Sequence, residues 1–113
     1  MIHVSMAEAK RATAKDGVYR LLQAEGLVDE AEAIDTARSR EAIERETRSA
    51  RYACFSLAAE RVGSGDVDDA VALNVIGLAC LWTARAHAPG TDEHSAACAD
   101  AAIRFVDMCE TLP

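Results

Sequence analysis

The chain has 113 residues, of which half are hydrophobic and 27% are charged. This composition is that of an ordinary folded domain and excludes a disordered tail. Twelve Lys and Arg residues against nineteen Asp and Glu residues give a formal net charge of −7. Such a charge disfavours sequence-independent binding to nucleic acid and to anionic membranes. We therefore expect one domain, residues 1–113, with neither nucleic acid nor membrane as a direct partner.

The pattern of residues 5–26 predicts a first helix. Ser5 and Glu8 have the spacing of a capping box, in which a hydroxyl and a carboxylate bind free backbone amides at a helix start. Gly26 is a candidate for a left-handed helix end. Gly17 lies in the middle of this segment and costs about 1 kcal/mol relative to alanine in a helix. The segment is therefore either one helix, kinked at Gly17, or two short ones.

A second helical pattern begins with Asp29 and Glu32, which repeat the capping spacing, and no Gly or Pro follows before Val62. Within residues 38–51, Ile43 is the only large apolar side chain, and Glu and Arg stand four residues apart in the stabilising order. The segment contains five arginines: Arg38, Arg40, Arg45, Arg48 and Arg51. It is locally positive, so we expect either a solvated, salt-bridged helix face or a docking surface for an acidic partner or a second copy.

Gly63, Ser64 and Gly65 predict a turn, and Asp66 predicts the N-cap of the next helix. From residue 70 to residue 82 nearly every side chain is apolar, which is typical of a central helix covered on several sides. A second copy of the chain is a candidate to cover part of this helix. The residues that we expect at such a contact are Val75, Leu78 and Trp82.

The same apolar run is shorter than the roughly 20 residues that span a bilayer, so no transmembrane segment is expected. Residues 1–14 lack the apolar core of a secretory signal. The four cysteines (Cys54, Cys80, Cys98 and Cys109) follow no zinc or redox spacing. Buried free thiols in a reducing compartment are the expectation, which favours the cytoplasm.

Thr91 and the acidic residues after it predict the start of a last helix, whose apolar face runs from Cys98 to Leu112. No strand pattern or long linker occurs in the sequence. The expected fold is therefore all-α, a small bundle of about four helices joined by short turns.

Gly65, Asp66 and Ala70, with Leu57 and Ala58 upstream, form a pattern that resembles the turn between the two helices of a tetratricopeptide repeat. The resemblance covers one helical hairpin and implies peptide binding. Gly26 repeats it weakly, but it stands 39 residues before Gly65, whereas the tetratricopeptide period is 34 residues.

Two carboxylate pairs are candidate magnesium ligands: Glu41 with Glu44, and Asp66 with Asp69. This arrangement resembles the all-helical nucleotide pyrophosphohydrolases of the MazG type. Carboxylates three residues apart share a helix face, and a divalent ion that bridges phosphates suits hydrolysis of a nucleoside triphosphate. Arg40 replaces one of that family's glutamates. The hypothesis requires the carboxyl groups of the two pairs to approach within about 5–6 Å.

The expectation that the sequence favours most is a non-enzymatic protein interaction domain without a cofactor, self-associating as a homodimer. One alternative is an acidic inhibitor, similar to an antitoxin, that covers the nucleic-acid-binding surface of an enzyme. That alternative requires the acidic helix starts near Asp66 and Asp92 to lie at the same end of the bundle. The other alternative is the magnesium-dependent pyrophosphohydrolase.

Overall fold

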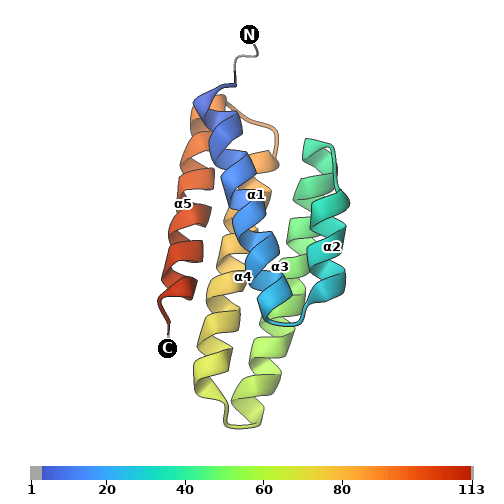
Figure 1. Cartoon of the computed structure of the whole chain (residues 1–113), viewed down its shortest axis with the longest axis vertical. Helices are drawn as coiled ribbons and strands as arrows, with labels where there is room; N and C mark the ends of the chain where they lie inside the picture. Colours follow the sequence, from blue (N-terminus) through green and yellow to red (C-terminus); the bar gives the residue numbers. More distant parts are fainter. Residues whose placement is uncertain (1–3, 113) are drawn as a thin grey trace.

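The computed structural model describes residues 4–112, which form five α-helices (Figure 1). The helices are α1 (Met6–Ala24), α2 (Val28–Thr36), α3 (Arg40–Gly63), α4 (Val67–His87) and α5 (Asp92–Glu110). The predicted all-α bundle with short connections is confirmed. The number of helices exceeds the predicted four or so, because the segment that follows Asp29 forms two helices.

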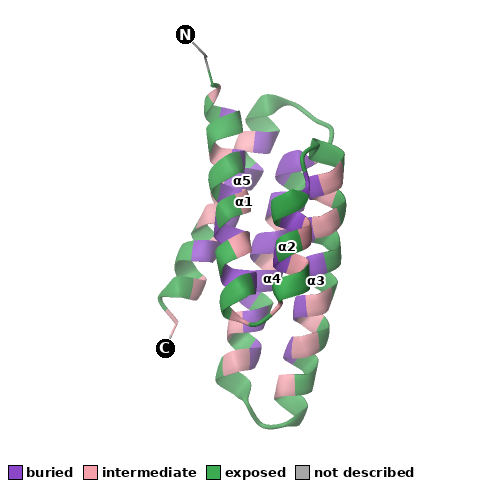
Figure 2. Cartoon of the chain, turned by 45° about the vertical axis from the view of Figure 1, so that its right-hand side comes forward, coloured by how far each residue is buried: buried purple, intermediate pink, exposed green. Residues whose placement is uncertain are grey.

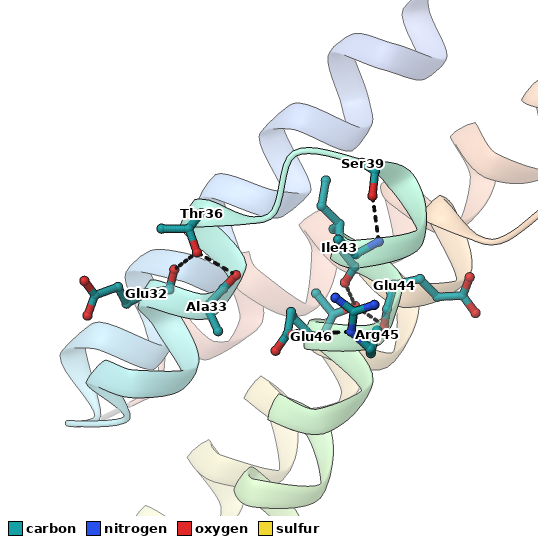
Figure 3. Close-up of polar contacts among 10 residues, drawn as sticks. Glu32, Ala33, Thr36, Ser39, Ile43, Glu44, Arg45 and Glu46 are labelled. Carbon is teal, nitrogen blue, oxygen red and sulfur yellow. Dashed lines mark hydrogen bonds and ion pairs between the residues drawn. The ribbon is translucent and has the colours of Figure 1, made fainter.

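Two hydroxyl side chains flank the break between α2 and α3 (Figure 3). Thr36 Oγ1 donates to the carbonyl oxygens of Glu32 at 3.0 Å and Ala33 at 3.3 Å, at the end of α2. Ser39 Oγ accepts a hydrogen bond from Ala42 N at 3.1 Å and so caps α3. Hydroxyl residues favour helix ends for this reason. The chain turns here without a Gly or Pro.

Helix α4 is the central helix, as its composition predicts. It packs against α1, α3 and α5, whereas α2 covers only α1 and α3. Figure 1 shows α1 crossing in front of α4, with α3 and α5 on either side. Eleven of the 21 residues of α4 are buried.

Helices α1 and α5 run in the same direction. The ammonium group of Lys10 lies 2.8 Å from Asp100 Oδ2, and Arg20 Nη2 lies 2.8 Å from Glu110 Oε1. Both partners advance by ten residues between the two ion pairs, which requires parallel helices in register. Successive helices otherwise alternate in direction, so α1, α3 and α5 all begin at the upper end in Figure 1.

Most of the predicted helix caps are present. Ser5, Asp66 and Thr91 each accept a hydrogen bond from the backbone amide three residues later. The predicted cap at Asp29 is wrong, because α2 begins one residue earlier and Leu27 occupies its N-cap position without a side-chain bond. Asp29 instead lies in the first turn, where the helix dipole favours a carboxylate.

Small residues allow the helices to pack closely. Half of the buried hydrophobic residues in the described chain are alanine, and no aromatic residue is among them. Gly17 lies against Val106, where an added Cβ would be 2.8 Å from a methyl carbon. Gly77 lies in the same way against the ring of Phe55. Helix α1 is continuous through Gly17, so this glycine marks a helix contact and not a helix break.

The four cysteines are free thiols, and Cys54, Cys80 and Cys98 are buried as predicted, while Cys109 is half-buried. A hydrogen bond with Cys54, together with burial, raises the pKa of Cys80 well above its usual value. Thiolate is the reactive form of cysteine. Cys80 is therefore protected from reagents both by burial and by its raised pKa.

By length and composition alone, α4 is sufficient to cross a membrane, because the helix is longer than the apolar run on which the prediction rested. Half of its most apolar window is buried within the bundle. A core helix of a globular domain meets the same criterion.

Candidate functional site

The outward side of α4 is a stripe of partly exposed residues that the other described helices leave uncovered. We call it the outer stripe, and its members are Val67, Val71, Asn74, Leu78, Trp82 and Arg85. They follow one another at steps of three and four residues, which places them on one helix face. Val67 is 58% exposed and Val71 is 44% exposed, although both side chains are apolar. Figure 2 shows exposed and half-buried residues on the lower part of α4.

Of the three predicted contact residues, only two belong to the outer stripe. Leu78 and Trp82 are half-buried at the surface. Val75 is only 8% exposed and lies in the interior of the bundle. The prediction of Val75 as a surface contact is therefore wrong, because this residue lies on the side of α4 that the chain itself covers.

A groove of about 500 Å³ adjoins the outer stripe, between α4 and α5. Its lining is Trp82, Ala97, Asp100, Ala101, Arg104, Phe105 and Met108. Trp82 belongs to both surfaces, and the guanidinium carbon of Arg85 lies 4.9 Å from the centre of its ring. Met108 is 48% exposed. The stripe and groove together form a continuous, largely apolar surface flanked by charged groups.

The predicted arginine-rich face is not one surface. Arg45 pairs with Glu46 at 3.3 Å and Arg48 with Glu44 at 2.9 Å, so their charges are locally balanced (Figure 3 shows the first pair). Arg51 stacks on the ring of Tyr52, with 4.6 Å between the guanidinium carbon and the ring centre. Arg45 and Arg48 form the salt-bridged, solvated helix face that was one of the two expectations, whereas Arg51 is half-buried and has no ion pair among the described residues.

Arg38 and Arg40 line a cavity of about 330 Å³ at the upper end of the bundle, and Arg38 also lines a neighbouring cavity with Arg45. We call the first of these the basic cavity, and its lining is Glu8, Arg11, Ala12, Lys15, Arg38, Arg40, Ile43 and His87. The side chains come from α1, the α2–α3 connection, the start of α3 and the last residue of α4. Sequence analysis missed this cavity because its residues are spread over 80 positions of the sequence.

The four carboxylates predicted to bind magnesium do not meet. Glu41 and Glu44 lie in the first turns of α3, whereas Asp66 and Asp69 lie at the start of α4, beyond the far end of α3. At 1.5 Å per residue the two pairs are separated by about 28 Å. No group of three or more potential metal ligands occurs among residues 4–112. Because α3 is a single long helix, the geometry excludes an ion shared by the two pairs.

The acidic helix starts also lie apart. Because α4 and α5 are successive antiparallel helices, Asp66 is at the lower end of the bundle in Figure 1 and Asp92 is at the upper end. Asp69 is bound by Arg61 at 2.7 Å and Asp92 lies 3.9 Å from Arg11. The single acidic surface required for an inhibitor of the predicted kind is therefore not formed.

Comparisons with models of protein families, with curated proteins and with solved structures found no match for this chain. The hairpin that resembles a tetratricopeptide repeat is present as α3 and α4, with Gly65 at φ +84° in its turn. Its first helix alone has 24 residues, whereas a complete repeat of two helices has 34.

Proposed function

We propose that this protein is a small interaction domain that self-associates, and that the outer stripe of α4 and the adjoining α4–α5 groove form the contact. The observation that supports this proposal best is the outer stripe itself. Four of its six side chains are apolar, and each of the four is exposed or half-buried on the outward side of the central helix. Contiguous apolar surface of this kind is typical of protein–protein contacts.

The occupant that fits this surface is a second copy in antiparallel orientation. Arg85 lies at one end of the stripe, and Asp68, which is exposed near the start of α4, lies beside the stripe residue Val67 at the other end. When two α4 helices pack antiparallel, each Arg85 faces the Asp68 of the other copy, and Asn74 faces Leu78. A twofold contact of this kind is self-complementary, which is the property that homodimer interfaces require.

The proposed role is binding and not catalysis, and we place it in the cytoplasm. The free thiols of the described chain support a reducing compartment. A partner protein of another kind that uses the same surface would compete with the second copy.

The test is the mass of the protein in solution, measured by sedimentation equilibrium over about 1–100 µM, a range that brackets moderate dimer affinities. We expect a dimer for the wild type and a folded monomer for Leu78→Asp, because the aspartate would be desolvated in the contact. Val28→Asp is the matched control, since Val28 is 51% exposed on α2, outside the stripe. This control should remain dimeric.

A monomeric wild type over the whole range would overturn the proposal. So would a Leu78→Asp variant that is folded by circular dichroism and still dimeric. If Leu78→Asp does not fold, Val71→Asp provides the same test, because Val71 is 44% exposed and its replacement leaves the core intact.

A further inference from the structure

The strongest feature outside the proposed contact is the basic cavity. Four permanent cations line it, one third of the Lys and Arg residues of a chain whose net charge is −7. Among the described residues, the one carboxylate in the lining is Glu8, which is exposed. Two further carboxylates lie near its edge, because Asp92 Oδ1 is 3.9 Å from Arg11 Nη1 and Glu41 lines an adjoining cavity with Arg40 and His87. The four cations outnumber these carboxylates, so the cavity is a local reversal of the overall charge.

Three of the four cations are held by neutral partners. Arg38 Nη1 donates to the carbonyl oxygen of Asp35 at 3.2 Å. Arg40 Nη2 donates to the carbonyl oxygens of Ala86 at 3.3 Å and Ala88 at 3.1 Å, at the end of α4. Lys15 Nζ donates to Ala37 O at 3.0 Å, just after α2. Cations at helix C-termini are stabilised by the carbonyl dipoles. These contacts hold the side chains in place without neutralising their charge.

Arg11 lacks such support. It is only 8% exposed, and its Nη1 is buried without a hydrogen-bond partner among the described residues. The nearest carboxylate oxygen, Asp92 Oδ1, lies 3.9 Å from Nη1, and the Asp92 side chain is 76% exposed. A buried guanidinium without a hydrogen bond is costly to the folded state. A bound anion would compensate this cost.

His87 adds a titratable group to the lining of the basic cavity. It is 5% exposed, and the 2.9 Å contact of its Nδ1 with Thr83 O makes Nδ1 the protonated nitrogen of the neutral ring. Burial lowers the pKa of His87, and the charges of Arg11, Arg40 and Lys15 lower it further. A bound anion would oppose those charges and favour the doubly protonated ring, which can donate from Nε2.

We propose that the basic cavity binds the phosphate group of a small molecule. Arg11, Arg38 and Lys15 would bind the phosphate oxygens, and Arg40 is a positioning residue between the cavity and the carbonyl end of α4. The first turn of α3 begins at the cavity, so its dipole adds positive potential. Four permanent cations favour a dianion over a carboxylate. A volume of about 330 Å³ also leaves room for a small organic group beside the phosphate.

The test is a titration with inorganic phosphate at constant ionic strength, followed by calorimetry and by the histidine ring signals in NMR spectra. We expect saturable binding of one phosphate per chain and an increase in the pKa of His87. Arg38→Gln should weaken binding about tenfold or more, because it removes a charge-assisted hydrogen bond. Arg45→Gln is the matched control, since Arg45 lies outside the cavity and pairs with Glu46, and it should bind as the wild type does.

The Arg11→Met variant distinguishes an effect on phosphate binding from an effect on stability. It should abolish phosphate binding and yet leave the thermal midpoint in phosphate-free buffer unchanged or higher, because it removes a buried charge without a hydrogen-bond partner. If this variant does not fold, the phosphate affinity of Arg38→Gln tests the proposal instead, because Arg38 is exposed. Absence of saturable phosphate binding to the wild type would overturn the proposal, as would equal binding to the wild type and Arg38→Gln. Saturable binding of acetate without binding of phosphate would overturn the assignment to phosphate.

Discussion

The outer stripe of α4 and the basic cavity differ in how the chain builds them. The stripe comes from one helix, and its residues follow one another at helical steps. The cavity comes from four segments, and its charged side chains meet only when α1, α3 and α4 are packed. A surface of the first kind is present wherever the helix forms, whereas a site of the second kind depends on the arrangement of the whole bundle. Substitutions that change the packing between helices should therefore affect the basic cavity more than the outer stripe.

The largest effect is expected within α4, at the boundary between core and stripe. Val75→Asp places a carboxylate at a position that is 8% exposed, and we expect a loss of about 3 kcal/mol or more in unfolding free energy. Three residues further along, Leu78→Asp should leave the fold intact. Chemical denaturation of both variants measures the contrast, and equal destabilisation would show that the two sides of α4 are not distinct.

A smaller effect is expected for Gly17→Ala, which acts on the packing of α1 against α5. The new Cβ would lie 2.8 Å from a methyl carbon of Val106, so the helices must separate slightly, at a cost of about 1–3 kcal/mol. Because Arg11 and Lys15 lie on the same helix, phosphate binding should weaken, whereas self-association through the proposed contact on α4 should be retained. Gly17→Ala/Val106→Ala removes the clash and serves as the control. Unchanged phosphate affinity in a destabilised Gly17→Ala variant would contradict a packing-dependent cavity.

The smallest effect concerns pH and His87. Its folded pKa lies below the ordinary histidine value, mainly because the ring is buried, so the unfolded chain binds the proton more readily. The stability of the protein without phosphate should therefore decrease as the pH falls below about 6.5, the unperturbed value. The comparison is with His87→Gln, measured by denaturation at several pH values. An identical pH dependence in the two proteins would show that His87 contributes nothing to it.

The sequence predicts the helices and their ends well because those features are local. Capping side chains at Ser5, Asp66 and Thr91 act over three residues, and the turns at Gly26 and Gly65 need a positive φ that glycine readily adopts. The sequence did not locate the break at residues 37–39 because it contains neither glycine nor proline, and the Ser39 cap at the start of α3 is apparent in the structure.

The candidate sites are predicted less completely, for a physical reason. Leu78 and Trp82 follow from the apolar character of α4, but periodicity alone does not decide which side of such a helix the chain itself covers, and Val75 was misplaced for that reason. The hydrogen bonds of Arg40 depend on the packing of the end of α4 against the start of α3, and the place of Arg38 beside Arg11 depends on the packing of α1. No short-range pattern connects Arg11 with His87, so the basic cavity becomes apparent only in the folded chain.

The most direct test of the proposed self-association is a charge-exchange cycle on α4. Sedimentation equilibrium would give the dimer dissociation constants of the wild type, Asp68→Arg, Arg85→Asp and the double variant. If two copies pack antiparallel along the outer stripe, each single exchange places like charges together and weakens the dimer, and the double exchange restores it. Single exchanges that leave the dissociation constant unchanged, or a double variant that shows only the sum of the two losses, would contradict this arrangement.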